Sequence, residues 1–152
     1  MEALKGEATM DDDTAPRAVA GWFKIAAIAS IAFMALGCVS YLMQVTADRE
    51  QLTVDQRALL DAAPTWMWAA FAVAVWVGLA GTIALLLRKR LAVNLLGVSL
   101  AAVLVQFSSY LLVRQLRDLM SLDGFVVPVV IVLLTWTVFW FAWSSRKKGW
   151  LN

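Results

Sequence analysis

Four apolar stretches, each long enough to cross a lipid bilayer as a helix, take up most of this chain. They run from Gly21 to Gln44, Thr65 to Leu87, Leu91 to Val113 and Phe125 to Ser144. A membrane-spanning helix needs about 20 apolar residues at a rise of about 1.5 Å per residue, and every stretch reaches that length. The sequence therefore predicts an all-α integral membrane protein: a bundle of four transmembrane helices over residues 15–150, behind a disordered acidic tail over residues 1–14.

The composition agrees with this prediction and excludes several functions. Hydrophobic residues make up 62% of the 152 residues and the mean hydropathy is +0.75, whereas a globular domain is nearer half apolar. The chain has no histidine, the commonest general base and metal ligand, and its single cysteine excludes an internal disulfide. The formal charge of +2 forms no basic stripe with interleaved aromatics, which argues against nucleic-acid binding. Because no nucleophile–base pair is visible either, we predict no enzyme, cofactor, metal site or catalytic residue.

Charge in the short loops predicts how the bundle sits in the membrane. Arg88-Lys89-Arg90 joins the second and third stretches, and Arg146-Lys147-Lys148 follows the fourth. Loops rich in lysine and arginine stay in the cytoplasm, and residues 45–64 carry two arginines against four acids. Arg114 and Arg117 oppose this orientation but are outnumbered, so both termini are predicted to be cytoplasmic.

The first outer loop contains a capping-box pattern, Thr53-Val54-Asp55-Gln56. This pattern predicts a short amphipathic helix on the outer membrane surface. A solvated connector without regular structure is the alternative reading.

The single cysteine, Cys38, has two readings. Ala35-Leu36-Gly37-Cys38 loosely matches a bacterial lipobox, which would predict lipidation. The apolar sequence continues past the cysteine, however, and this favours a small thiol packed between helices.

Small residues at four-residue spacing predict where helices approach each other closely. The second stretch carries the clearest stripe, and single glycines in the first and third stretches extend the set. The predicted helix-packing residues are Ala70, Ala74, Gly78, Gly81, Gly37 and Gly97.

The third and fourth stretches have the least ordinary helical faces. In the third, small and polar residues occupy two nearly opposite faces, which leaves Val93, Leu96, Leu100 and Phe107 for lipid. A helix of this kind is expected either at the centre of its bundle or at a position shared between the bundle and an oligomer. In the fourth, Pro128 is expected to kink the outer end and free a backbone carbonyl.

Uncharged polar side chains are the only candidates for a ligand site. Gln106 is the foremost of them, because it lies near the expected midplane and could hydrogen-bond a neutral solute. It could equally tie two helices together, which is the commoner role of such a glutamine. The full set of solute-binding or interhelical candidates is Gln106, Ser99, Asn94, Tyr110, Tyr41 and Gln44.

No aspartate or glutamate falls in the central part of any stretch. Proton relays and ion-coupled antiporters usually carry such groups inside the membrane. The compact four-span multidrug transporters have a membrane-embedded glutamate in their first span, and this chain lacks one there.

Several segments resemble a group of small four-span bacterial inner-membrane proteins, some of which are labelled sugar transporters. The segments are Ser40-Tyr41-Leu42-Met43-Gln44, Pro64 followed by Trp66, Leu87-Arg88-Lys89-Arg90 and Leu104-Val105-Gln106. The resemblance implies a multi-pass protein of the bacterial cytoplasmic membrane. Two functions are left open: a transporter of a small neutral polar solute that acts as an oligomer, and a structural or accessory subunit of a larger membrane complex. The expected partners are the lipid bilayer and either further copies of the chain or another membrane protein.

Overall fold

The computed structural model describes residues 21–119 and 122–151, so the predicted acidic tail lies outside the described residues. Within this part of the chain, four helices are long and apolar enough to cross a membrane, which makes the protein an all-α integral membrane protein. The spanning helices are α1 (Gly21–Val45), α3 (Thr65–Leu86), α4 (Leu91–Leu112) and α6 (Val126–Lys147). The shorter elements are η1 (Arg49–Gln51), α2 (Val54–Ala62), α5 (Arg114–Leu119) and η2 (Leu122–Phe125).

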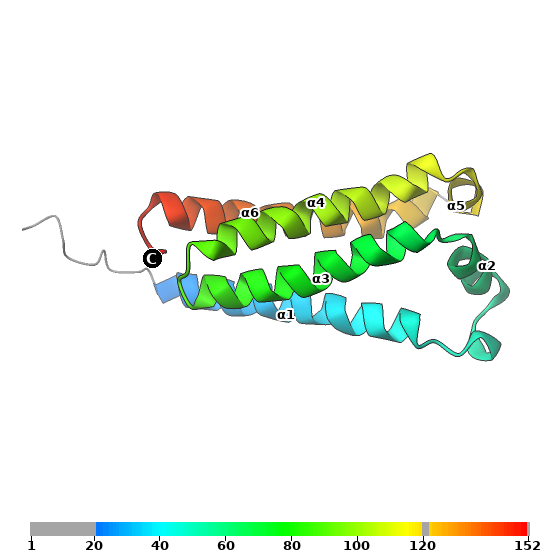
Figure 1. Ribbon diagram of the computed structural model, residues 1–152, viewed down its shortest axis with the longest axis horizontal. Helices are drawn as coiled ribbons and strands as arrows, with labels where there is room; N and C mark the ends of the chain where they lie inside the picture. The colour runs from blue at the N-terminus through cyan, green and yellow to red at the C-terminus, as the bar shows by residue number, and fades with distance from the viewer. Residues whose placement is uncertain (1–20, 120–121, 152) are drawn as a thin grey trace, which may run out of the picture.

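The four spanning helices run side by side along the long axis of the molecule (Figure 1). Close packing joins α1 to α3, α3 to α4 and α4 to α6. Helices α1 and α6 are not among the closely packed pairs of the described residues. The bundle is therefore an open series of helices, with α3 and α4 inside it and α1 and α6 at its two edges.

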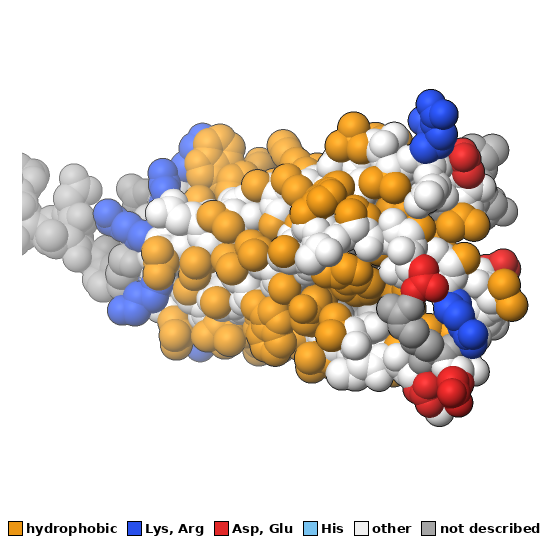
Figure 2. Space-filling model, turned by 45° about the vertical axis from the view of Figure 1, so that its right-hand side comes forward, with side chains coloured by type: hydrophobic (Ala, Val, Ile, Leu, Met, Phe, Trp, Pro, Cys, Tyr) orange, Lys and Arg blue, Asp and Glu red, His pale blue; other side chains and the backbone are white. Residues whose placement is uncertain are grey.

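The two ends of the bundle differ in charge. One end, which we call the basic end, carries the α3–α4 hairpin and the C-terminal segment; its described cations are Lys24, Arg88, Lys89, Arg90, Arg146, Lys147 and Lys148. The other, the loop end, carries α2 and α5 with both acids and arginines. Figure 2 shows hydrophobic side chains over the middle of the face in view, with charged side chains gathered at the two ends. This distribution suits a protein whose middle lies in hydrocarbon.

The C-terminal segment folds back onto the α3–α4 hairpin at the basic end. Arg88 takes a left-handed conformation with φ of 60°, and backbone bonds from Arg88 to Leu85 and from Lys89 to Ala84 close the helix end. The Arg88 Nε then donates to the Trp150 carbonyl oxygen at 2.9 Å. Leu151 is 2% exposed, so the segment after α6 is part of the packed structure as far as Leu151.

The helix predicted in the first outer loop is confirmed as α2. The Gln56 backbone N–H donates to Thr53 Oγ1 at 3.3 Å, and the Gln56 side-chain oxygen accepts from the Thr53 N–H at 3.1 Å. These reciprocal bonds form the capping box that the sequence pattern predicted. Helix α2 lies across the loop end of the bundle (Figure 1).

The kink predicted at Pro128 depends on where the fourth span begins as a helix. Helix α6 begins at Val126, which places Pro128 in its first turn. The backbone N–H groups of a first turn have no partner within the helix, so a proline there breaks no bond within α6, and the kink stays a prediction.

The lipid-facing side predicted for the third span is wrong in part. Val93, Leu96 and Leu100 of α4 are buried in the bundle. The exposed side of α4 carries Val98 and Leu104 instead. The physical reason is that lipid and protein interior are equally apolar, so a valine or leucine can face either one. The central place of α4, between α3 and α6, is as expected.

Candidate functional site

A cavity of about 500 Å³ lies between all four spanning helices, in the half of the bundle nearer the loop end. That volume falls within the range of about 300–1,000 Å³ typical of small-molecule sites. Most of the lining is apolar, and the described lining residues carry no charge. The uncharged polar side chains that line it are Ser40, Gln44, Gln106, Tyr110 and Thr135.

The side-chain amide of Gln106 is the deepest group of the cavity lining that has no hydrogen-bond partner among the described residues. Its side chain is 6% exposed and lines the cavity six residues before the end of α4, about 9 Å inside at about 1.5 Å per residue. No other described residue forms a hydrogen bond with its side-chain amide. An amide both donates and accepts, and leaving it unpaired in an apolar interior costs about 1–3 kcal/mol. The Gln106 amide therefore has a hydrogen-bond donor and an acceptor that no described residue uses.

Ser99, two turns away on the same helix, lies in a different environment. Its hydroxyl is fully buried and donates to the Ala74 carbonyl oxygen of α3 at 2.6 Å. It does not line the cavity. The structure thus gives Ser99 an interhelical bond and separates it from Gln106.

Tyr110 lies one turn from Gln106, toward the loop end. It lines the same cavity, and its ring stacks on that of Phe107 with centroids 5.9 Å apart. Gln44 of α1 is exposed at the same rim, where its Nε2 donates to the Ser40 carbonyl oxygen at 3.2 Å. These two residues form the polar rim of the cavity above Gln106.

The two remaining polar candidates lie outside the cavity. Tyr41 packs edge-on against Phe71 at 5.3 Å between ring centroids, but it is not a lining residue. Asn94 is exposed in the first turn of α4, at the basic end and far from Gln106 along the helix. Neither residue can share a ligand with Gln106 in this arrangement.

The small residues lie where helices approach each other. A Cβ atom added to Gly78 would stand 2.6 Å from Ser99 Oγ and 2.7 Å from Met34 Sδ, and one added to Gly81 would stand 2.9 Å from Leu96 Cγ. Gly37 faces Val75 at 3.1 Å and Gly97 faces Phe139 at 3.4 Å. Ala74, one turn before Gly78 on α3, is buried, and Ala70, a further turn away, is half-buried.

Cys38 is buried between α1 and α3, where its Sγ donates to the Val75 carbonyl oxygen at 3.5 Å. Its surroundings are those of a packed thiol.

The aromatic and threonine walls of the cavity were not identified from the sequence. Trp68 and Phe71 were not among the candidates from the sequence, yet both line the cavity from α3. Trp68 and Phe71 are three residues apart in the sequence, about one helical turn, and their ring centroids are 6.5 Å apart. That three-residue spacing is the one sequence signal that could have identified them. Thr135 enters from α6, with its hydroxyl donating to the Ile131 carbonyl oxygen at 2.8 Å.

A second cavity, of about 480 Å³, lies directly beneath α2. It shares four lining residues with the first cavity, and these stand between the two spaces: Gln44, Met67, Trp68 and Tyr110. Leu59 and Leu60 of α2 form its roof. The amphipathic helix thus covers the way from the loop end to Gln106.

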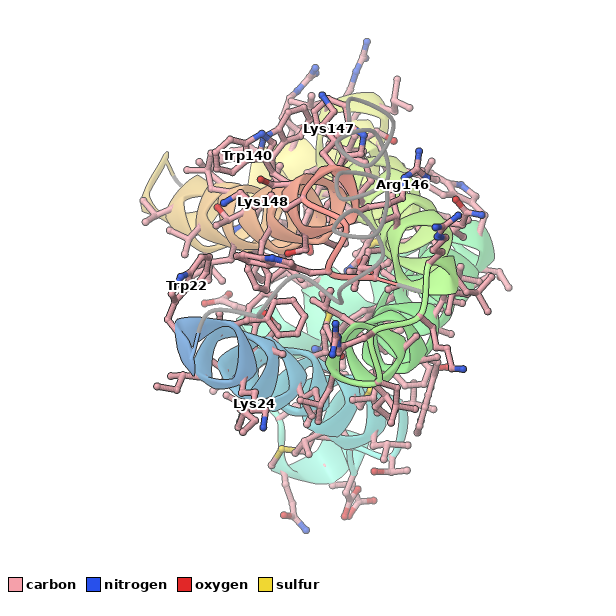
Figure 3. The ribbon with its side chains drawn as sticks, turned by 90° about the vertical axis from the view of Figure 1, so that its left-hand side faces the viewer. Trp22, Lys24, Trp140, Arg146, Lys147 and Lys148 are labelled. Carbon is pink, nitrogen blue, oxygen red and sulfur yellow. The ribbon has the colours of Figure 1, made fainter. Side chains whose placement is uncertain are left out.

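Aromatic side chains close the bundle at the basic end. Trp22 and Phe23 of α1 meet Phe141 of α6 at centroid distances of 5.4 and 5.5 Å, and both also meet Trp150. We call Trp22, Phe23, Phe141 and Trp150 the aromatic clamp. Figure 3 shows Trp22 in the opening between α1 and α6, viewed onto the basic end. The clamp joins the two edge helices at the end of the bundle away from the cavity.

Comparison with protein-family models, curated proteins and solved structures gives no match to this chain. Its function must therefore be inferred from the cavity.

Proposed function

We propose that the protein binds a small uncharged solute in the four-helix cavity and carries it across the membrane. The observation that supports this most is the free side-chain amide of Gln106, which is 6% exposed and lines the cavity. A glutamine whose role was to tie two helices together would have its amide bonded to the neighbouring helix, as the Ser99 hydroxyl is bonded to Ala74. A binding residue keeps its amide free for the ligand.

The lack of charge in the described lining supports an uncharged solute. A buried ion needs a partner of opposite charge or several hydrogen bonds, because desolvation of an isolated ion is costly. The polar side-chain groups of the described lining are amide, phenol, hydroxyl and indole N–H groups, all of them uncharged. These groups fit hydroxyl and carbonyl functions.

Transport by this protein requires more than one copy, in our proposal. Four helices surround the cavity incompletely, because α1 and α6 are not closely packed along their length. A second copy would complete the wall. By its resemblance to the four-span bacterial proteins, we place this oligomer in the bacterial cytoplasmic membrane, with the basic end inside.

An accessory subunit is the second candidate function. It is favoured by α6, whose spanning window is only 17% buried and which carries Trp136 and Trp140 on its exposed side. Such a face suits a neighbouring membrane protein. An accessory role makes no use of a free amide at Gln106, and the two functions can therefore be separated by the following experiment.

We expect an uncharged solute to shift the NMR signal of the Gln106 side-chain amide. The protein would be held in lipid nanodiscs and titrated with glycerol, a hexose and decanol in turn. Gln106→Met, which keeps the length of the side chain and removes its amide, assigns the signal. Asn94→Met assigns the matched control amide, which is exposed at the basic end.

At least one of the three solutes should move the Gln106 signal and leave that of Asn94 in place. If no solute moves it at any concentration that the nanodisc tolerates, the proposed function is wrong and the accessory role gains support.

A further inference from the structure

The cavity opens sideways, toward the lipid. Leu36 of α1 and Val127 of α6 both line it, and they are 68% and 63% exposed on the outer surface of the bundle. They lie on the two edge helices, which are not closely packed against each other among the described residues. The opening between α1 and α6 therefore faces the hydrocarbon of the bilayer at this level.

The same gap is shut at both of its ends. At the basic end, the aromatic clamp fills it, and Lys148 Nζ lies 4.9 Å from the ring of Trp150. At the loop end, α2 roofs the second cavity, and Met67 and Trp68 stand between that space and Gln106. A molecule dissolved in the lipid therefore meets fewer obstacles on its way to Gln106 than one dissolved in water.

The lining suits a molecule with one polar group and an apolar body. The Thr135 hydroxyl and the Gln44 amide nitrogen already donate to backbone carbonyls. Gln106 and Tyr110, one turn apart, are left for a ligand, and the Ser40 hydroxyl and the Trp68 indole N–H also belong to the lining. A sugar would bring many hydroxyls into this space, and each one left unpaired would cost about 1–3 kcal/mol. A single hydroxyl or carbonyl can be satisfied by Gln106 alone.

We infer that the ligand of this cavity is an uncharged amphipath dissolved in the membrane, which enters between α1 and α6. Its hydroxyl or carbonyl head binds the Gln106 amide, and its apolar tail lies along Ile131 and Val127 toward the lateral opening. This inference rests on the proposed function, because it names the class of solute and the route that it takes. It changes the small neutral polar solute expected from the sequence to one that has a single polar head and an apolar body.

Photolabelling in liposomes tests this assignment. The probe is decanol carrying a diazirine on its chain, and the comparison probe is a hexose carrying the same group. We expect decanol to label α1 between Phe33 and Gln44 and α6 between Val127 and Thr135, and unlabelled decanol in excess to remove that labelling. Competition in the unaltered protein requires no variant to fold.

Two variants of α6 locate the route. Ile131→Trp places a large ring in the cavity and should abolish the specific labelling, because Ile131 is a lining residue. Leu134→Trp is the matched control, because Leu134 is 45% exposed and is not a lining residue; it should leave the labelling unchanged. Gln106→Met should weaken competition by decanol roughly 2- to 10-fold, the value of one net hydrogen bond.

The outcomes separate this inference from the proposed function. Labelling of the cavity by the hexose but not by decanol would overturn the amphipath and keep the solute-binding function. Labelling by neither probe would overturn both. Decanol labelling spread evenly over all lipid-facing helices, or unaffected by excess decanol, would show partition into the bilayer and would also overturn the inference.

Discussion

Gly78→Leu is expected to abolish the folded bundle. Gly78 is buried where α3 meets both α1 and α4, and even a single added carbon would stand 2.6 Å from Ser99 Oγ and 2.7 Å from Met34 Sδ. Ser99 cannot easily yield, because its hydroxyl is bonded to the Ala74 carbonyl oxygen, and the flexible end of Met34 has little room to move, because Met34 is 4% exposed in the core. In a bilayer, close packing supplies much of the attraction between helices, so forcing α3 away from two partners removes most of it.

The measurement is the fraction of monodisperse protein in detergent and its thermal unfolding followed by circular dichroism. Gly21→Leu is the matched control, since a Cβ atom at Gly21 meets nothing within 4 Å. Alanine substitutions at Gly78 and Gly97 test the same contact with a smaller side chain. Gly78→Ala should lower the free energy of unfolding by about 1–3 kcal/mol, as overpacking of a core does. Gly97→Ala should be tolerated, because its nearest neighbour is at an ordinary 3.4 Å. A Gly78→Leu protein that folds as the parent does would show that the α1–α3–α4 contact is not as close as described.

Phe23→Ala is expected to produce the second large loss. Phe23 is 1% exposed and holds the aromatic clamp together, with Phe141 at 5.5 Å and Trp150 at 5.8 Å between ring centroids. Removing a fully buried phenylalanine side chain costs about 3–5 kcal/mol when the site cannot collapse. Here collapse is hindered, because α1 and α6 lack close packing elsewhere.

The free energy of unfolding in a dodecyl sulfate titration measures this effect. Ile25→Ala is the control on the same turn of α1, and its side chain is 72% exposed, so a change within about 0.5 kcal/mol is expected. Equal losses for Phe23→Ala and Ile25→Ala would mean that the clamp does not stabilise the α1–α6 contact.

The element pattern of this chain was predictable because it depends on local signals. Apolar length sets the four spans, and the hydrogen bonds of the capping box depend on residues three apart in the chain. The faces of α4 were not predictable to the same degree. In a soluble protein, Leu96 and Leu100 would have been assigned to the core by their hydrophobicity, but in a membrane that property does not distinguish the bundle interior from lipid.

The candidate site was likewise predictable from the sequence only in part. Gln106 stood out in the sequence because an amide in mid-membrane is unusual, and Ser99 was among the candidates beside it. Their difference depends on tertiary packing: α3 places Ala74 against Ser99, whereas the cavity takes up the space around Gln106. Empty space leaves no trace in sequence periodicity. The cavity walls were missed for that reason, even where the residues were as conspicuous as Trp68.

The central claim is that Gln106 faces open space while Ser99, on the same helix, is packed. Reactivity of a single cysteine at each position tests it most directly. In a Cys38→Ala background, Ser99→Cys and Gln106→Cys proteins in membranes would be exposed to N-ethylmaleimide, a small uncharged reagent, and the modified fraction read by mass spectrometry. Thermal unfolding would first establish that both proteins are folded.

We predict that Gln106→Cys is modified and that Ser99→Cys is protected until the protein is denatured. Equal protection of both positions, or equal modification, would contradict the account.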